Sequence, residues 1–235
     1  MTRSGRRLAI TDNNLLVNFV DAGQAELLSR YCQDKILISP SVIEPTEVYP
    51  FLSPPTSEFN IIIHKAQLAL ARHARLTAQG ETPDPPDALL QRRAMFRLEY
   101  LSARNTLWET VELTEDDARY RYTLQQDPRM KRLKRRQADA ECLSLAHRRG
   151  LTLLTDDQPV VDAAGLLGVT TLRTCGLLIE MVNAGLLSAG DAASLFNGVM
   201  VDQLNFSARR KRGGARERLV LTAHPLSCQW VLDAR

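Results

Sequence analysis

Two apolar segments of the sequence end in aspartate, and both are typical of buried strands. Residues 7–12 (RLAITD) end at Asp12, and residues 151–155 (LTLLT) are followed by Asp156 and Asp157. Open parallel sheets bind ligands at the carboxyl ends of their strands. A single aspartate at such a position is more often a turn or a helix cap. Two such strands, with further carboxylates on nearby helices, favour a shared site at one edge of a sheet.

A helix expected at 138–149 offers two further acids. Asp139 lies on the same face as Cys142, within the apolar stripe that must face the sheet. Glu141 lies nearer the flank, because residues two apart on a helix do not share a face. Asp139 is therefore the preferred inward ligand and Glu141 a reserve. A first-turn acid that stabilises the helix N-terminus explains the position of Asp139 nearly as well.

The helix expected from about Ser41 also carries two acids. Ser41 and Glu44 have the spacing of a capping box, which would give Glu44 a structural role. Glu47 shares a face with Ile43 and would point inward. If the helix begins with Pro45 at its first position instead, Glu44 becomes the cap and Glu47 the third-position acid. Glu47 is the preferred candidate in both cases, with Glu44 in reserve.

Carboxylates that converge from separate elements without a matching cationic cluster need a cation. At ~5 Å and an effective dielectric constant of ~20, each pair repels by about 3 kcal/mol. Ligand sets made only of oxygen suit Mg²⁺ or Mn²⁺, and such ions activate water and orient a phosphodiester. The sequence thus predicts a metal site whose ligands are also the catalytic acids: Asp12, Glu47, Asp139 and Asp157, with Glu44, Glu141 and Asp156 in reserve.

Strand-like and helix-like segments alternate along most of the chain. This order predicts an α/β fold, a three-layer α/β/α sandwich with a central parallel sheet. The middle of the chain differs, because two long amphipathic helices at 61–79 and 87–108 predict a helical hairpin inserted at about 55–108. We expect one domain over residues 1–206 that includes the hairpin, followed by a basic linker and tail at 207–235.

Basic residues are concentrated more strongly than the formal net charge of +3 suggests. One run covers 129–136 and another covers 209–218. Such runs are commonly solvated faces. The first run leads directly into the helix that carries Asp139, so its cations can hold phosphates beside a metal site. The predicted phosphate-binding residues are Lys131, Arg132, Lys134, Arg135 and Arg136.

The cysteines and the apolar segments predict the setting of the protein. The four cysteines show no CxxC and no zinc spacing, so we expect them to be reduced and mostly buried: Cys32, Cys142, Cys175 and Cys228. The apolar run near the N-terminus is too short for a signal peptide, and no run approaches the length of a spanning helix. We therefore expect a cytoplasmic protein without a membrane partner.

Four segments of the chain resemble the PIN-domain family of metal-dependent ribonucleases. The segment AITDNNLL at 9–16 is similar to the opening strand of the family, and LLTDD at 153–157 to a later strand that ends in acids. ADAECLSLA at 138–146 is close to the family form G-E-A-E-A-x-A-L-A, and 41–48 to its helix ending in Glu-Leu. The resemblance implies that the metal-binding acids are Asp12, Glu47, Asp139 and Asp157. It also implies that Asn14 orients Asp12 without binding the metal itself.

The resemblance covers residues 7–52 and about 110–200, and it leaves the hairpin and the basic tail outside. It implies cleavage of RNA by a metal-activated water, which leaves a 5′-phosphate and a 3′-hydroxyl. Because the family includes toxins of toxin–antitoxin pairs, it also implies a small antitoxin partner and a homo-oligomer. Two alternatives stay open. One is a PIN-like RNA- or protein-binding module without catalysis, and the other is a nucleotide- or phosphate-binding doubly wound domain, for which no glycine-rich phosphate loop is evident.

Overall fold

The computed structural model of the protein describes residues 9–33, 35–43, 57–80, 85–101, 106–134, 136–203, 215–220 and 227–232. Within them, one sheet has five short strands that all run parallel to their neighbours. These strands are β1 (Ala9–Thr11), β2 (Ile36–Ile38), β3 (Trp108–Thr110), β4 (Thr152–Leu154) and β5 (Thr171–Leu172). The predicted α/β class with a central parallel sheet is confirmed.

The order of the strands across the sheet is β3-β2-β1-β4-β5. Strands β2 and β3 are added on one side of β1, and β4 and β5 are added on its other side. The order in which strands are added therefore reverses between β1 and β4. Thr11 lies opposite Leu154 in these adjacent strands, and the backbone N–H of Asp12 donates to the carbonyl of Leu154 at 3.0 Å. Open α/β sheets bind ligands at such a reversal point, beyond the carboxyl ends of the strands.

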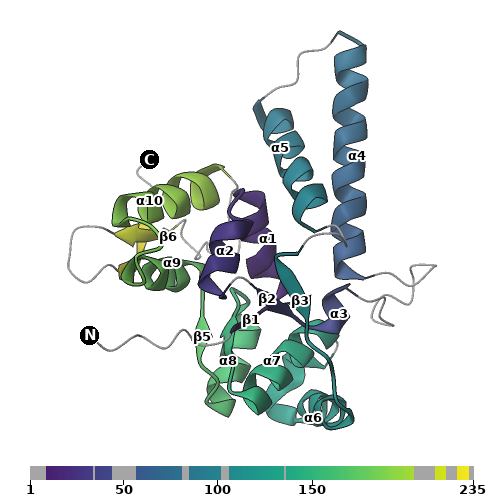
Figure 1. Ribbon diagram of the computed structural model, residues 1–235, viewed down its shortest axis with the longest axis vertical. Coiled ribbons are helices and arrows are strands. Elements are labelled where there is room, and N and C mark those ends of the chain that lie inside the picture. The colour runs from purple at the N-terminus through teal and green to yellow at the C-terminus, as the bar shows by residue number, and fades with distance from the viewer. Residues whose placement is uncertain are drawn as a thin grey trace.

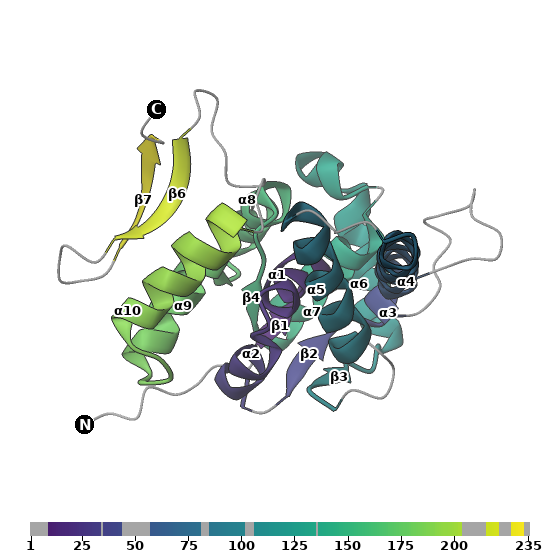
Figure 2. The same ribbon diagram turned by 90° about the horizontal axis from the view of Figure 1, so that it is seen from above.

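Helices cover both faces of the sheet, which gives the predicted three layers (Figures 1 and 2). Ala9 points into one core and Ile10 into the other, as the alternation of a buried strand requires. The first core includes α1 (Asn13–Asp21), α2 (Ala25–Tyr31), α9 (Thr174–Asn183), α10 (Ala189–Ala193) and the π-helical η2 (Ser194–Gln203). The second includes α6 (Glu115–Gln126), the 3₁₀ helix η1 (Pro128–Leu133), α7 (Gln137–Arg149) and α8 (Gln158–Leu167).

The junction of α6 and α7 shows how local sequence sets these helices. Thr114 and Asp117 form a capping box at the start of α6, and Gly150 ends α7 with a left-handed φ of 63°. Asp117 also accepts hydrogen bonds from Arg148 at 2.9 Å and Arg149 at 2.6 Å, which ties the two helices together. Burial acts to raise the pKa of Asp117, but hydrogen bonds from Arg149, Thr114 and Arg148 outweigh it and hold that pKa well below its usual range.

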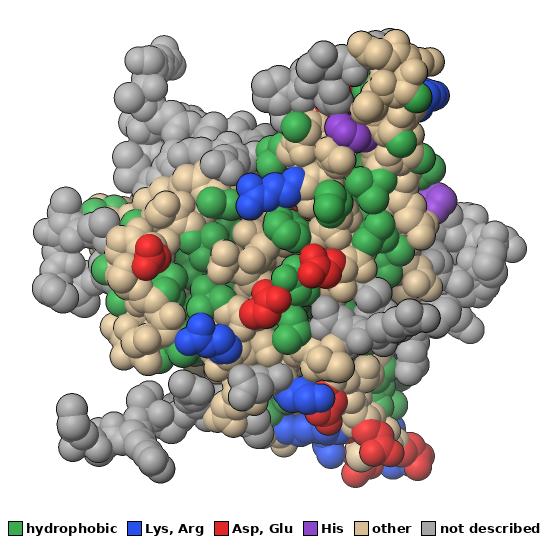
Figure 3. Space-filling view, turned by 45° about the horizontal axis from the view of Figure 1, so that its top comes forward, with side chains coloured by type: hydrophobic (Ala, Val, Ile, Leu, Met, Phe, Trp, Pro, Cys, Tyr) green, Lys and Arg blue, Asp and Glu red, His purple; other side chains and the backbone are tan. Residues whose placement is uncertain are grey.

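A helical hairpin, α4 (Glu58–Ala78) with α5 (Pro85–Tyr100), projects from the body of the protein (Figure 1). It lies between the short helix α3 (Pro40–Ile43) and β3, where two long helices were predicted. The second of them was predicted to reach residue 108, which is wrong, because α5 ends at Tyr100 and Trp108 begins β3. The two helices pack on each other, and hydrophobic side chains still reach the surface over this part (Figure 3). The most exposed of these are Leu68, Leu90 and Met95.

The base of the hairpin is fixed to the end of α1. The buried carboxylate of Asp21 accepts hydrogen bonds from both Arg93 and Arg97, with shortest distances of 2.6 Å in each case. Gly23 has a φ of +67°, and an added Cβ there would lie 2.8 Å from the ring of Phe96. A glycine is required at this position because it permits both the backbone conformation and the close approach of α5.

Within the C-terminal segment, residues 215–220 and 227–232 form a β-hairpin. Strands β6 (Ala215–Val220) and β7 (Ser227–Leu232) pair antiparallel beside α9 and α10, on the opposite side of the molecule from α4 (Figure 2). The side-chain amide of Asn197 makes two 2.9 Å hydrogen bonds with the backbone of Leu219. A disulfide joins Cys175 to Cys228. The expectation of four reduced cysteines is therefore wrong for this pair, and that of a basic linker is wrong for residues 215–218.

Candidate functional site

Asp12 lies directly after β1 and its residue is 2% exposed. One carboxylate oxygen accepts a hydrogen bond from the backbone N–H of Leu15 at 2.8 Å, which caps α1. The other accepts a hydrogen bond from the hydroxyl of Thr155 at the end of β4. Asn14, which the resemblance assigns to orienting Asp12, is exposed. Leu15 and Thr155 hold the carboxylate in its place.

Asp139 and Asp157 meet around one basic side chain. Asp139 is in the first turn of α7 and Asp157 is at the start of α8, and their side chains are 19% and 15% exposed. The guanidinium of Arg136 donates to both carboxylates, at 3.1 Å to Asp139. Asp157 stands at the N-cap of α8 without a side-chain cap bond, so its charge is directed at Arg136. Arg136 was predicted to bind RNA phosphates, but it is paired with acids here.

The reserve acid Asp156 has a structural role. It accepts hydrogen bonds from the backbone N–H of Thr174 at 3.1 Å and from the hydroxyl of the same residue. The amide of Asn18 donates to it at 3.3 Å. Asp156 therefore holds the start of α9 against α1, and most of its hydrogen-bonding capacity is taken.

The reserve acid Glu141 is also held by structural contacts. It is 1% exposed and accepts hydrogen bonds from the backbone N–H of Ser41 at 2.8 Å and from its hydroxyl at 2.9 Å. Arg121 donates to it at 3.0 Å. The prediction that Asp139 is the inward acid and Glu141 the flanking one is wrong, because α6 covers the other side of α7 and Glu141 is the more buried of the two.

An acid that the sequence did not single out joins the site from the helical hairpin. Glu58 is in the first turn of α4, and it accepts a hydrogen bond from the side chain of Asn13. It is close enough to Asp139 and Arg136 to interact electrostatically with both. The carbonyl oxygen of the Asn13 side chain is buried and has no hydrogen-bond partner.

The protonation equilibria of the acids show that they form one electrostatic group. Burial, and after it the charges of Asp156 and Asp139, raise the pKa of Asp12 well above its usual value despite hydrogen bonds to its carboxylate. Burial and the charge of Asp157 raise the pKa of Asp139 against the effect of Arg136. Burial and Asp139 raise the pKa of Glu58 to about 7. Each carboxylate thus destabilises the charge of its neighbours, which a bound cation would reverse.

The oxygen ligands suit Mg²⁺ or Mn²⁺, but the described residues do not present a finished metal site. Among them, no group of three or more Asp, Glu, His or Cys side chains is arranged to hold an ion. Glu44 and Glu47 lie outside the described residues, so the predicted second acid is not placed. The types of ligand fit a hard divalent cation. Their arrangement requires Arg136 to leave Asp139 and Asp157 before an ion can be bound.

The basic run beside the site is anchored rather than freely solvated. Met130 and Leu133 are buried at 2% and 0% exposure, and they fix η1 to the second core. Lys131, Arg132 and Lys134 are exposed and form no ion pair with the described residues. Arg135 lies outside the described part of the chain. The exposed cations lie in the segment that leads into α7, and their contact with phosphates stays a prediction.

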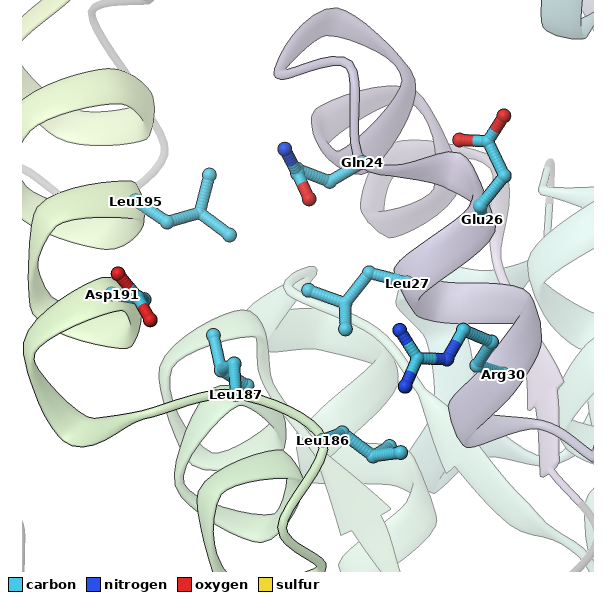
Figure 4. Close-up of a pocket in the computed structure, with 8 residues that line it drawn as sticks. All are labelled: Gln24, Glu26, Leu27, Arg30, Leu186, Leu187, Asp191 and Leu195. Atoms are coloured by element: carbon cyan, nitrogen blue, oxygen red, sulfur yellow. The ribbon is translucent and has the colours of Figure 1, made fainter.

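A separate pocket of about 340 Å³ lies between α2 and the segment that leads into η2 (Figure 4). Leu27 and Leu187 face each other across it, and the charged residues of its rim are Glu26, Arg30 and Asp191. Tyr100 donates to Glu26 at 2.7 Å, so part of the rim belongs to the contact with the hairpin. None of the predicted acids that lie in the described residues lines this pocket.

Comparisons with protein-family models, curated proteins and solved structures find no match to the chain. The resemblance to the PIN-domain family therefore stays a prediction from the sequence motifs. None of the described helices combines the length and apolar character that crossing a bilayer requires.

Proposed function

We propose that this protein is a Mg²⁺- or Mn²⁺-dependent endoribonuclease with a PIN-like fold that carries an inserted helical hairpin. The observation that supports the proposal best is the placement of Asp12 with Asp139 and Asp157 at the reversal point of a parallel sheet. These acids are largely buried. The charge of Asp139 raises the pKa of Asp12, and the charge of Asp157 raises the pKa of Asp139. Buried acids that repel one another destabilise a fold, whereas a bound cation stabilises their charged forms.

Each residue has a defined part in this proposal. Asp12, Asp139 and Asp157 would hold the ion, with Glu47 as a further ligand predicted from the sequence. The bound ion would supply an activated water and stabilise the developing charge on the phosphate. Thr155 and Leu15 keep Asp12 oriented, since they donate to its two carboxylate oxygens. The exposed cations at 131–134 would bind phosphates of the RNA backbone and so position the RNA beside the acids.

The proposal is tested by cleavage of end-labelled single-stranded RNA with and without MnCl₂. We expect cleavage that requires the metal, is abolished by a chelator and leaves 5′-phosphate ends. Asp139→Asn is expected to slow it by about two orders of magnitude or more, because it removes one charged ligand. Asp116→Asn is the matched control, since Asp116 is an exposed acid on α6. Equal cleavage by wild type and Asp139→Asn would remove the nuclease assignment.

A PIN-like binding module without catalysis is the second candidate, and Arg136 is the observation that favours it. A guanidinium that satisfies Asp139 and Asp157 makes a cation dispensable for the fold. This candidate predicts that millimolar Mn²⁺ leaves the melting temperature unchanged in both wild type and Asp12→Asn. A metal-dependent rise in wild type that Asp12→Asn lacks would exclude it.

A further inference from the structure

The β-hairpin of β6 and β7 is a separate element of the protein. Its two strands pair with each other over residues 215–220 and 227–232, and they lie outside the five-stranded sheet. A hairpin of two strands is marginally stable in water when nothing supports it. The stability of this hairpin therefore depends on how it is attached to the helices beside it (Figure 2).

The two strands are attached to the body of the protein in different ways. Non-covalent contacts hold β6, because Leu219 is 2% exposed within the first core and its backbone makes the two 2.9 Å hydrogen bonds with Asn197. A covalent bond holds β7, because the disulfide joins Cys228 to Cys175 in the first turn of α9. This bond links residues 53 positions apart and so restricts the open forms of this part of the chain.

The start of α9, which carries one end of the disulfide, is fixed by other contacts as well. Thr174 is 0% exposed, and its backbone N–H and its hydroxyl both donate to Asp156 beyond the end of β4. Cys175 is 1% exposed and belongs to the first core. Breaking the disulfide therefore leaves the start of α9 in place and removes a constraint on β7.

The two bonded cysteines differ in their access to solvent. Cys175 is buried, whereas Cys228 is half-buried. A thiolate from solution therefore reaches the sulfur of Cys228 more readily than that of Cys175. The other two cysteines, Cys32 and Cys142, are free thiols that are buried, so they are shielded from this exchange.

We propose that the β6–β7 hairpin is a redox-sensitive strap, which the disulfide locks against α9 and a dithiol reductant releases. One thiolate of the reductant attacks the sulfur of Cys228, and the sulfur of Cys175 leaves and takes up a proton. The second thiol of the reductant loses its proton, attacks the mixed disulfide and frees Cys228, which takes up a proton in turn. The reductant becomes a disulfide, and the two cysteines gain two electrons and two protons. This inference does not depend on the proposed nuclease function.

Hydrogen exchange of the full-length protein, followed by mass spectrometry, tests the inference. The protein is compared after oxidation in air and after treatment with dithiothreitol, which is a dithiol. We expect the amides of β6 and β7 to exchange about 10- to 100-fold faster in the reduced protein, because the constraint of the bond is lost. The amides of α7 should not change, and they serve as the internal reference.

Two variants control for other effects of the reductant. Cys228→Ser should exchange like the reduced wild type with or without dithiothreitol. Cys32→Ala, which removes a free thiol, should keep the response of wild type.

Three results would overturn the inference. If the air-oxidised protein shows more than two reactive thiols after unfolding, the disulfide does not form, since only Cys32 and Cys142 are free. If β6 and β7 exchange at the same rate in both redox states, the bond does not control the hairpin. If α7 loses protection together with the hairpin on reduction, the bond supports the whole fold and does not act on a strap.

Discussion

Replacement of Arg136 by glutamine should tighten the binding of metal. Its guanidinium donates to both Asp139 and Asp157, and an ion that binds these carboxylates must displace it. Pairs of this kind contribute about 0.2–1 kcal/mol each when partly exposed. The Arg136 side chain is 42% exposed, whereas those of Asp139 and Asp157 are 19% and 15% exposed, which favours the upper part of that range.

Two such contacts together amount to about 1–2 kcal/mol, which corresponds to Mn²⁺ binding tighter by about 5- to 30-fold. Without metal, Arg136→Gln should lose stability by the same amount, because two neighbouring carboxylates lose their cation. The two effects have opposite signs in one variant. A merely structural arginine would produce only the loss of stability.

The assay is a series of melting curves at increasing MnCl₂ concentration for wild type and Arg136→Gln. The matched control is Arg129→Gln, since Arg129 belongs to the same basic run but pairs with Asp127, outside the acidic site. We expect the melting temperature of Arg136→Gln to start below that of wild type and to rise at lower Mn²⁺ concentration. If Arg136→Gln binds Mn²⁺ no more tightly than wild type, Arg136 does not occupy the place of the ion.

Two further predictions concern stability. Asp117→Ala should lower the free energy of unfolding by about 2–4 kcal/mol at pH 7, because it leaves Arg148 and Arg149 without their buried partner. Hydrogen bonds, chiefly from Arg149, overcome the effect of burial and lower the pKa of Asp117. The stability that ionised Asp117 contributes is therefore present above about pH 4 and is lost as the pH falls further. Urea unfolding at pH 7, 5 and 3 should show the difference in stability between wild type and Asp117→Ala narrowing only at the lowest pH. Gly23→Ala should cost about 1–3 kcal/mol from backbone strain and from contact with Phe96, and thermal unfolding no different from wild type would contradict this account of the hairpin anchor.

The parts of the fold that sequence could predict are those set by neighbouring residues. The strand at 7–12 could be recognised because an apolar run ends in an acid that can cap the next helix, and Asp12 does cap α1. The ends of α6 and α7 follow from Thr114 and Gly150 for similar local reasons. The pairing of Cys175 with Cys228 spans 53 residues and has no such local signal.

The periodicity of α7 could not separate Asp139 from Glu141, because an amphipathic pattern assumes one buried face and one solvated face. The helix lies between the sheet and α6, so residues 140–146 are all buried. Burial alone therefore does not mark a ligand in this helix. The contacts distinguish the two acids. Glu141 is hydrogen-bonded to Ser41 and Arg121, whereas Asp139 is hydrogen-bonded only to Arg136 among the described residues.

Arg136 and Glu58 escaped prediction for a shared physical reason. The sequence shows Arg136 as one member of a basic run, and it shows Glu58 as the first-turn acid of a long helix. Both descriptions are locally correct. The role of each residue depends on the packing of separate elements. Arg136 pairs with Asp139 of α7 and with Asp157 at the start of α8, and the pKa of Glu58 is raised by Asp139 from another part of the chain. Strand-end acids mark where a site is built in such a sheet, and the residues that regulate its charge come from elements that only the fold brings there.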